Sequence, residues 1–394
     1  MEEEGEESLL YMVIPTLQIR ADRERLLAAV SAADAVVPTT STKPIQTHLL
    51  LEAKDGMVEV TASDSQVGMR AVVSGIEIQQ PGSVVVQSRQ LAMILKESSS
   101  PAVDLQVVPS GDSVLLQIRL SDGDYTLPLI IGETLPPVTF FPAEAKSISL
   151  SGKRFEHMMR QTAFAMDKDR SSPVLSGLLM SISRGEMWLA ATDGKVLAEA
   201  IEKDESFVPP EGESFQAVLP FGTVTHLVRI LSSGQPDRVL IAFNTASQLV
   251  FARLRLAGDL TVDLTSRLVE GSFPAYRMAI SGTATSVVTF DTPVLASAVR
   301  RVSLMITAAN RAVVLRLEKD KAILENLPGV GGNARIPLAC QYSGNPVRLG
   351  INAAYLSDVL RIYGGERLAV ELGRGLIMRE PGATYLVMPI SLPS

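Results

Sequence analysis

The sequence predicts an α+β fold made of three repeated domains, each with two helices packed on antiparallel sheets. Two observations carry this prediction: amphipathic helical stripes recur about every 130 residues, and runs of alternating apolar residues separate them. The length of 394 residues suits about three domains. With 46% hydrophobic and 20% charged residues, the chain is too apolar and too weakly charged for a disordered protein.

The first helix of each repeat has apolar residues at i, i+3, i+4, i+7 and i+10, which form one face of a helix. These stripes begin at Leu26, Phe155 and Leu295 and end ten residues later. The second helix has an i, i+3, i+4 set after a cap or turn at Ser88, residues 220–222 or Asn352. These sets begin at Leu91, Val224 and Leu356, which are 133 and 132 residues apart. Two helix sets with one period indicate a true repeat.

Alternating apolar runs follow each first helix at 49–61, 177–190 and 314–324, and each run is typical of a hairpin with a polar turn. Similar runs at 103–120, 239–254 and 368–388 follow each second helix. Linkers lie near 141–143 and 271–283. We therefore expect an acidic N-terminal tail at 1–16 and domains at 17–142, 143–274 and 275–394.

Composition argues against several kinds of site. The single cysteine, Cys340, excludes a disulfide framework and a cysteine-based zinc site, and the three histidines lack metal-ligand spacing. Phosphate-loop, metalloprotease and hydrolase motifs are absent from the sequence, so we expect no catalytic residue, no metal and no cofactor. No apolar run is long enough to span a membrane, and the acidic N-terminus is unlike a signal peptide. We therefore expect a cytoplasmic protein.

Four strings stand out in the second and third repeats. They are ATDGKVLA at 191–198, RLVEGSFPAYR at 267–277, NAAYLSDVL at 352–360 and YLVMPI at 385–390. Taken alone, Thr192-Asp193-Gly194 predicts a turn with a structural carboxylate, since Asp-Gly after a strand is a turn signal. Together with the threefold repeat, the strings closely resemble the bacterial DNA polymerase III β subunit, the replication sliding clamp family. The resemblance runs from about residue 17 to the end of the sequence.

The resemblance implies a head-to-tail ring dimer that encircles double-stranded DNA without reading its sequence. Helices would line the hole and sheets would form the outside. A head-to-tail contact closes only where the rotation fits. The positions that match the family's dimer interface are Tyr125 and Leu127 in the first domain, and Leu304 and Met305 in the third.

The resemblance also implies a peptide-binding pocket between the second and third domains. In the family it accepts short linear motifs, typically similar to Gln-Leu-x-Leu-Phe, from the replicative polymerase, the clamp loader and repair proteins. The matching positions are Leu175, Thr192, Gly194, Lys195, Val196, Leu197, Pro274, Met278, Ala279, Asn310, Asn352, Tyr355, Leu386, Met388, Pro389 and Ile390. Methionines in such a cleft would let it adapt to several peptides.

Some positions depart from the family pattern. Lys195-Val196 replaces a common His-Arg pair, and Met278 stands where a basic residue is usual, so the pocket rim is less basic. Phe221-Gly222 and Thr40 occupy positions that are often basic and face DNA. DNA contact is therefore expected to depend on other residues.

Charge is distributed unevenly along the chain. The six predicted helix windows (20–37, 86–97, 151–170, 220–232, 291–311 and 352–364) hold 15 Lys+Arg and 9 Asp+Glu, a net of +6. The whole chain carries −7, so the remainder carries −13. A basic helical lining and an acidic exterior suit a ring around DNA. The candidates for DNA contact are Arg20, Arg23, Arg25, Arg89, Lys153, Arg154, Arg160, Lys168, Arg170, Arg229, Arg300 and Arg301.

Two other functions stay open at this stage. The lower basic content also suits a paralogue of the same fold that acts as a protein-interaction scaffold and does not load onto DNA. A hydrolase using Asp193 or Asp64 would need a partner acid or metal set, and the sequence offers none.

Overall fold

A computed structural model describes residues 15–64, 66–111, 113–282, 284–306, 312–327 and 332–392. One order of elements occurs three times: a strand, a helix, several antiparallel strands, a second helix and three strands. This order confirms the repeat predicted from the two helix sets and the intervening alternation.

The first copy contains β1 (Gln18–Asp22), α1 (Arg23–Asp34), β2 (His48–Lys54), β3 (Met57–Ser63), β4 (Val67–Ser74), β5 (Glu77–Gln80), β6 (Gly82–Gln87), α2 (Ser88–Glu97), β7 (Ala102–Ser110), β8 (Ser113–Leu120) and β9 (Gly123–Ile130). The second contains β10 (Ser147–Ser151), α3 (Gly152–Ala163), β11 (Leu178–Ser183), β12 (Glu186–Thr192), β13 (Val196–Lys203), β14 (Ser214–Leu219), α4 (Phe221–Gly234), β15 (Arg238–Asn244), β16 (Leu249–Leu256) and β17 (Leu260–Arg267). The third contains β18 (Ser286–Asp291), α6 (Thr292–Ser303), β19 (Ala312–Glu318), β20 (Lys321–Asn326), β21 (Arg335–Ala339), β22 (Gln341–Tyr342), β23 (Val347–Asn352), α7 (Ala353–Ile362), β24 (Arg367–Leu372), β25 (Leu376–Glu380) and β26 (Ala383–Val387). The short helix α5 (Arg277–Ile280) lies between the second and third copies.

The sheets do not stop at the domain boundaries. At the first boundary β4 pairs with β17, and at the second β13 pairs with β26, both antiparallel. Consequently the chain forms two compact units that cut through the second repeat. One unit contains residues up to 153 with 229–267, and the other contains 154–228 with 268 onward. A 13-stranded sheet lies in the former, and sheets of nine and four strands lie in the latter. We call the β4–β17 pairing the first seam and the β13–β26 pairing the second seam.

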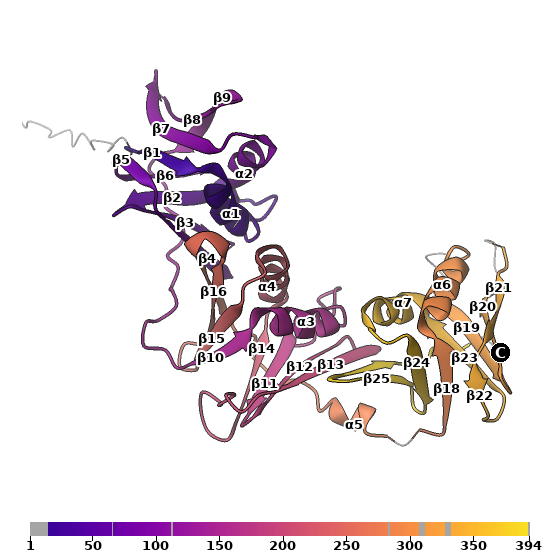
Figure 1. Ribbon diagram of the computed structural model, residues 1–394. Helices are drawn as coiled ribbons and strands as arrows, with labels where there is room; N and C mark the ends of the chain where they lie inside the picture. Colours follow the sequence, from indigo (N-terminus) through magenta and orange to yellow (C-terminus); the bar gives the residue numbers. More distant parts are fainter. Residues whose placement is uncertain are drawn as a thin grey trace, which may run out of the picture. The chain divides into compact units, whose positions relative to one another are not determined.

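Helices cover one side of these sheets because their apolar stripes are buried there. In the first repeat α1 packs against α2 and against β3 and β4, and α2 lies on β2 and β6 (Figure 1). Leu26, Ala29, Val30, Leu91 and Leu95 are fully buried in this layer. In the third repeat α6 and α7 lie side by side in the same way (Figure 1).

Each first helix ends slightly before its predicted stripe does. The last stripe residue, Val36, Ala165 or Met305, lies two residues beyond the helix and donates its backbone N–H to the carbonyl three residues earlier. The tighter i→i−3 bond continues the apolar face through one more turn. The predicted cap at Ser88 is wrong: Gln87 caps α2 by accepting from the N–H of Gln90, and Ser88 bonds to Asp34 instead. The predicted cap at Asn352 is confirmed, since its side chain accepts from the N–H of Ala354.

A row of charged residues crosses the first seam. Asp263 of β17 is 2% exposed and pairs with Arg70 of β4 at 2.9 Å and with Arg253 of β16 at 2.6 and 2.9 Å. These three residues are direct neighbours across the sheet. The linker covers the row, because Phe140 stacks on Arg70 and Phe141 on Arg253. A buried carboxylate needs such partners to offset its lost hydration.

Substituting Asp263→Asn should weaken the first seam, because it removes the carboxylate that pairs with Arg253 and leaves Arg70 only its longer pair with Glu59 at 3.8 Å. We expect the free energy of local opening at β4 and β17 to fall by about 3 kcal/mol, measured by native-state hydrogen exchange. Asp104→Asn is the matched control, since Asp104 lies in the same sheet and its pair with Arg20 is exposed. Its effect should stay within about 0.5 kcal/mol. Equal effects of the two substitutions would contradict the assignment.

Candidate functional site

The turn between β12 and β13 forms the polar end of the second seam. One carboxylate oxygen of Asp193 accepts the N–H groups of Lys195 and Val196, each at 2.8 Å. Its other oxygen accepts the hydroxyl of Tyr355 at 2.5 Å, which ties the turn to α7. Gly194 adopts φ of 85°, a conformation that favours glycine. The predicted turn with a structural carboxylate is confirmed.

The same turn occurs in the first repeat. Asp64 accepts the N–H groups of Gln66 and Val67 at 2.9 and 2.7 Å. Both aspartates therefore hold turns. Among the described residues, no cluster of three or more His, Cys, Asp or Glu side chains could hold a metal ion.

A cluster of apolar residues lies beside this turn on one face of the sheet. Leu197 of β13, Leu386 of β26 and Ile377 of β25 are direct neighbours across three strands. Ile280 of α5 completes this buried cluster, and Tyr276 and Ala279 pack against it. The helix α5 thus covers the second seam at the point where two domains share a sheet.

The predicted pocket residues differ in exposure. Pro274, Met278, Gly194, Lys195, Met388, Pro389 and Ile390 are exposed. Leu175, Ala279, Asn352 and Tyr355 are half-buried, whereas Thr192, Val196, Leu197 and Leu386 are buried beneath them. Met278 is 77% exposed, which is unusual for a large apolar side chain. Asn310 lies outside the described residues.

Further polar contacts join the second and third repeats around this surface. Glu380 of β25 accepts from Gln161 of α3 at 3.1 Å and from the hydroxyl of Tyr385 at 2.6 Å. Burial, together with the neighbouring Glu380 carboxylate, raises the pKa of Tyr385 well above its usual value. The hydroxyl therefore stays protonated and donates. Lys168 pairs with Asp358 of α7 at 3.6 Å.

Asp167 organises the loop that carries Leu175. Its carboxylate accepts the hydroxyl of Ser171 at 2.5 Å and the N–H groups of Asp169 and Ser171 at 3.1 and 2.9 Å. The N–H of Asp167 donates to the carbonyl of Leu175 at 2.9 Å. The sequence analysis did not identify Asp167. The only available signal is an acid directly after an apolar stripe, which is common on protein surfaces.

The first seam has the same strand geometry but lacks the open apolar surface. Gly68 occupies the register of Leu197, and Thr265 occupies that of Leu386. A Cβ added at Gly68 would lie 2.4 Å from a methyl of Val138, so the linker already packs into this space. The hydroxyl of Thr265 donates to the carbonyl of Thr139 at 2.6 Å. The chain's own linker therefore fills the first seam.

Most of the predicted DNA-facing cations lie on exposed surface. Arg20, Arg89, Lys153, Arg154, Arg160, Lys168, Arg170, Arg229, Arg300 and Arg301 are exposed. Several have acidic partners: Arg89 pairs with Asp34 at 3.3 Å, Arg160 with Glu156 at 2.9 Å, and Arg154 with Glu202. Arg25 is half-buried and donates to the carbonyl of Gly258 at 2.7 Å.

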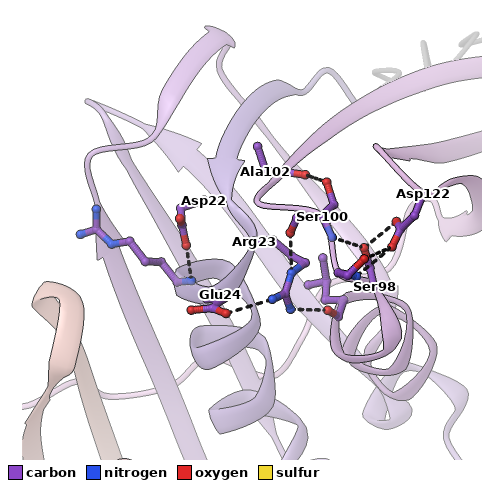
Figure 2. A network of polar contacts seen from close by, with 10 residues as sticks. Asp22, Arg23, Glu24, Ser98, Ser100, Ala102 and Asp122 are labelled. Carbon is purple, nitrogen blue, oxygen red and sulfur yellow. Dashed lines mark hydrogen bonds and ion pairs between the residues drawn. The ribbon is translucent and has the colours of Figure 1, made fainter.

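Arg23 does not fit the prediction of a DNA-facing cation. Its side chain is 11% exposed, and its guanidinium donates to the carbonyls of Leu95 and Ser100 at 2.8 and 2.7 Å (Figure 2). Figure 2 also shows that the carboxylate of Asp122 accepts a hydrogen bond from the hydroxyl of Ser98 in the same network. Arg23 thus donates to one carbonyl in the last turn of α2, where a helix offers no backbone donor, and to another just beyond its end.

A cavity of about 230 Å³ lies among α1, α2 and the end of α4. Arg89, Lys96 and Arg229 line it together with Asp34, and Met93 is exposed at its edge. Three cations against one carboxylate leave it positively charged, which suits a phosphate group. The list of predicted DNA contacts omitted Lys96, although it lies on the same helix as Arg89.

The four predicted dimer-contact residues differ in exposure. Leu304 is 78% exposed and Tyr125 is 43% exposed, and Met305 is half-buried. Leu127 is only 6% exposed, opposite the buried Leu116 on β8. For Leu127 the predicted contact with a second chain is therefore not supported, since its side chain already packs inside its own domain.

Solved structures share the fold of this chain along nearly its whole length. The DNA polymerase III beta subunit of Thermotoga maritima matches with a TM-score of 0.85 at 21% identity, covering 96% of this chain and all of the other. The DNA polymerase sliding clamp of Bacillus subtilis matches with a TM-score of 0.83 at 23% identity, with the same coverage. None of the helices in the described parts of the chain is long and apolar enough to cross a membrane.

Sequence comparisons then identify the family. Models of the N-terminal, central and C-terminal domains of the DNA polymerase III beta subunit match residues 17–136, 149–275 and 278–391. The beta sliding clamp of Bacillus subtilis is 25% identical over 390 residues, which cover 95% of this chain and 99% of that protein. The one from Streptomyces coelicolor is 27% identical over 391 residues, covering 95% and 100%. The chain therefore belongs to the DNA polymerase III beta subunit family.

Asp167 should make the stability of the folded chain depend on pH. The Ser171 hydroxyl bond lowers the pKa of Asp167 below its usual value of 3.8. A lowered pKa gives stability that is complete above the unfolded value and is lost as the pH falls through the folded value. The melting temperature of wild type should therefore exceed that of Asp167→Asn by a constant margin above about pH 5. That margin should shrink below pH 3.8. The control is Asp169→Asn. A difference in melting temperature between wild type and Asp167→Asn that does not change with pH would contradict the prediction.

Proposed function

We propose that this chain is a DNA sliding clamp, a non-catalytic protein that encircles duplex DNA as a ring of two chains and tethers a polymerase to it. Membership of the family along nearly the whole chain is the observation that carries this proposal. Its relatives at this length are named beta sliding clamps.

The charge distribution supports a DNA-facing helical surface. The helix windows carry a net of +6 against −13 in the remainder. Arg300 and Arg301, in the last turn of α6, are exposed and have no ion pair within the described part of the chain. Attraction to phosphates without contacts to base edges allows a protein to slide, because every position along the duplex is equivalent.

The surface at the second seam supports tethering. It offers exposed Met278, Met388 and Ile390 above the buried Leu197 and Leu386, with polar anchors at Tyr355 and Asp193. An apolar surface with few polar groups at a domain junction suits a short linear motif. The polymerase, the clamp loader and repair proteins are the proposed partners.

A ring needs an apolar contact between two chains. Leu304 and Tyr125 are exposed apolar side chains on the third and first repeats, as a head-to-tail contact requires. We propose that Leu304, Tyr125 and Met305 contribute to this contact.

Topological retention tests the proposed function directly. With a clamp loader and ATP, the protein should remain on nicked circular DNA and slide off after linearisation, because only a closed ring is held by the absence of DNA ends. The measurement is co-elution of labelled protein with DNA in gel filtration at increasing salt. Release from circular DNA with a functional loader present would instead favour a scaffold protein that does not load.

Leu304→Asp should convert the dimer to a monomer, because it buries a charge in an apolar contact. Light scattering should fall from about twice the chain mass of 42.3 kDa to that mass itself. Val294→Asp is the control, since Val294 is also an exposed apolar residue of α6 but lies in its first turn. Dimer mass in Leu304→Asp would show that the contact lies elsewhere.

A further inference from the structure

The helix α5 is held at its N-terminal end by a buried carboxylate. Glu199 of β13 is only 4% exposed and accepts the hydroxyl of Tyr276 at 2.6 Å and the Nε of Arg277 at 3.1 Å. Glu199 interrupts an otherwise apolar buried run, Val196–Ala200, where an aliphatic residue would pack at lower cost. A buried ion pair of this kind adds little net stability, because the lost hydration of the charges offsets their attraction.

The C-terminal end of α5 is held by Arg379 of β25. Its guanidinium donates to the carbonyl of Ile280 at 2.7 Å, to Glu371 at 3.1 Å and to the hydroxyl of Thr384 at 3.3 Å. Glu199, Thr384 and Arg379 are direct neighbours on β13, β26 and β25. The polar row of Glu199, Thr384 and Arg379 crosses the second seam, and its two charged members bond to opposite ends of α5.

The helix α5 has few interactions of its own that could stabilise it. It is four residues long, and no side chain caps its N-terminus. So short a helix is not stable alone, so its position depends on what it contacts. Apart from the polar row, these contacts include the apolar ones of Ile280 and Ala279 with the cluster of Leu197, Leu386 and Ile377, and the guanidinium of Arg277 over the Trp188 ring.

We propose that Glu199 and Arg379 are positioning residues for peptide recognition: they fix α5, and with it Met278 and Ala279, over the apolar surface that a partner's motif enters. This inference rests on the proposed peptide-binding function of the second seam. Glu199 and Arg379 need not touch the peptide, since they act through the placement of α5. Glu199 acts on α5 through its hydrogen bonds with Tyr276 and Arg277.

Trp188 reports the position of α5 without any peptide. The guanidinium of Arg277 lies 4.7 Å from the centre of the Trp188 ring, and the chain has one tryptophan. Glu199→Gln removes the charge that fixes Arg277, so the emission of Trp188 should shift or change in intensity. Glu202→Gln is the matched control: it removes a carboxylate from the same strand that pairs with Arg154, and its emission should equal that of wild type.

Peptide affinity is the second measurement. The probe is a synthetic peptide, Gln-Leu-Ser-Leu-Phe, titrated calorimetrically into the full-length protein. We expect Glu199→Gln and Tyr276→Phe to weaken the affinity about tenfold, the size typical of losing one hydrogen bond to a charged group. Stoichiometry per chain should stay unchanged, whereas partial unfolding would lower the stoichiometry and leave the affinity of the folded fraction as in wild type. Glu202→Gln should bind as wild type does.

The outcomes separate this inference from the proposed function. If wild type does not bind the peptide, the proposed peptide surface fails. If wild type binds and both Glu199→Gln and Tyr276→Phe bind equally well, the positioning role is overturned, whatever happens to Trp188. A loss of stoichiometry with unchanged affinity overturns it too, because Glu199 would then serve stability alone. Weaker binding at full stoichiometry, with altered Trp188 emission, supports it.

Discussion

Strand pairing across the domain boundaries is the interaction on which the rest of this chain depends. Because β4 pairs with β17 and β13 with β26, each boundary is the interior of a sheet, and its backbone groups are hydrogen-bonded as in any other part of that sheet. The polar residues in the same registers must then find partners within the sheet or in the linker that crosses it. Asp263 finds its partners in Arg70 and Arg253 of the neighbouring strands, whereas Glu199 pairs with Arg277 of the linker.

The two seams share one geometry but differ in the charged residues that occupy it. Arg70, Asp263 and Arg253 stand in the registers that Glu199, Thr384 and Arg379 occupy at the second seam. At the first seam the linker stacks aromatic rings on the arginines and packs Val138 on Gly68. At the second, the linker folds into α5 and leaves Met278 in solvent. The difference between the filled first seam and the open second seam thus comes from a few side chains.

The sequence predicted the order of strands and helices in all three repeats, because helical and alternating periods are local properties of the chain. The turn at Asp193 was predictable for the same reason. The join of β4 to β17 was not, since pairing between residues almost 200 positions apart leaves no local pattern. Arg23 and Leu127 show a related limit: an arginine beside a helix, or a leucine in a strand, has the same pattern whether it faces solvent or its own core. Among the omitted residues, Glu199 had a usable signal, because it is an isolated acid inside an apolar strand.

If partners bind at the second seam as proposed, the packing of Val138 in the first seam limits how they could share the protein. A chain with one open seam has a valency of one at that surface, so two proteins that use it cannot hold the same chain together. Occupancy then follows relative concentration and affinity, and a newly arriving partner gains access only as fast as the resident one dissociates. The packing of Val138 against Gly68 would thus restrict competing proteins to one binding surface on each chain, so that they exchange there one at a time.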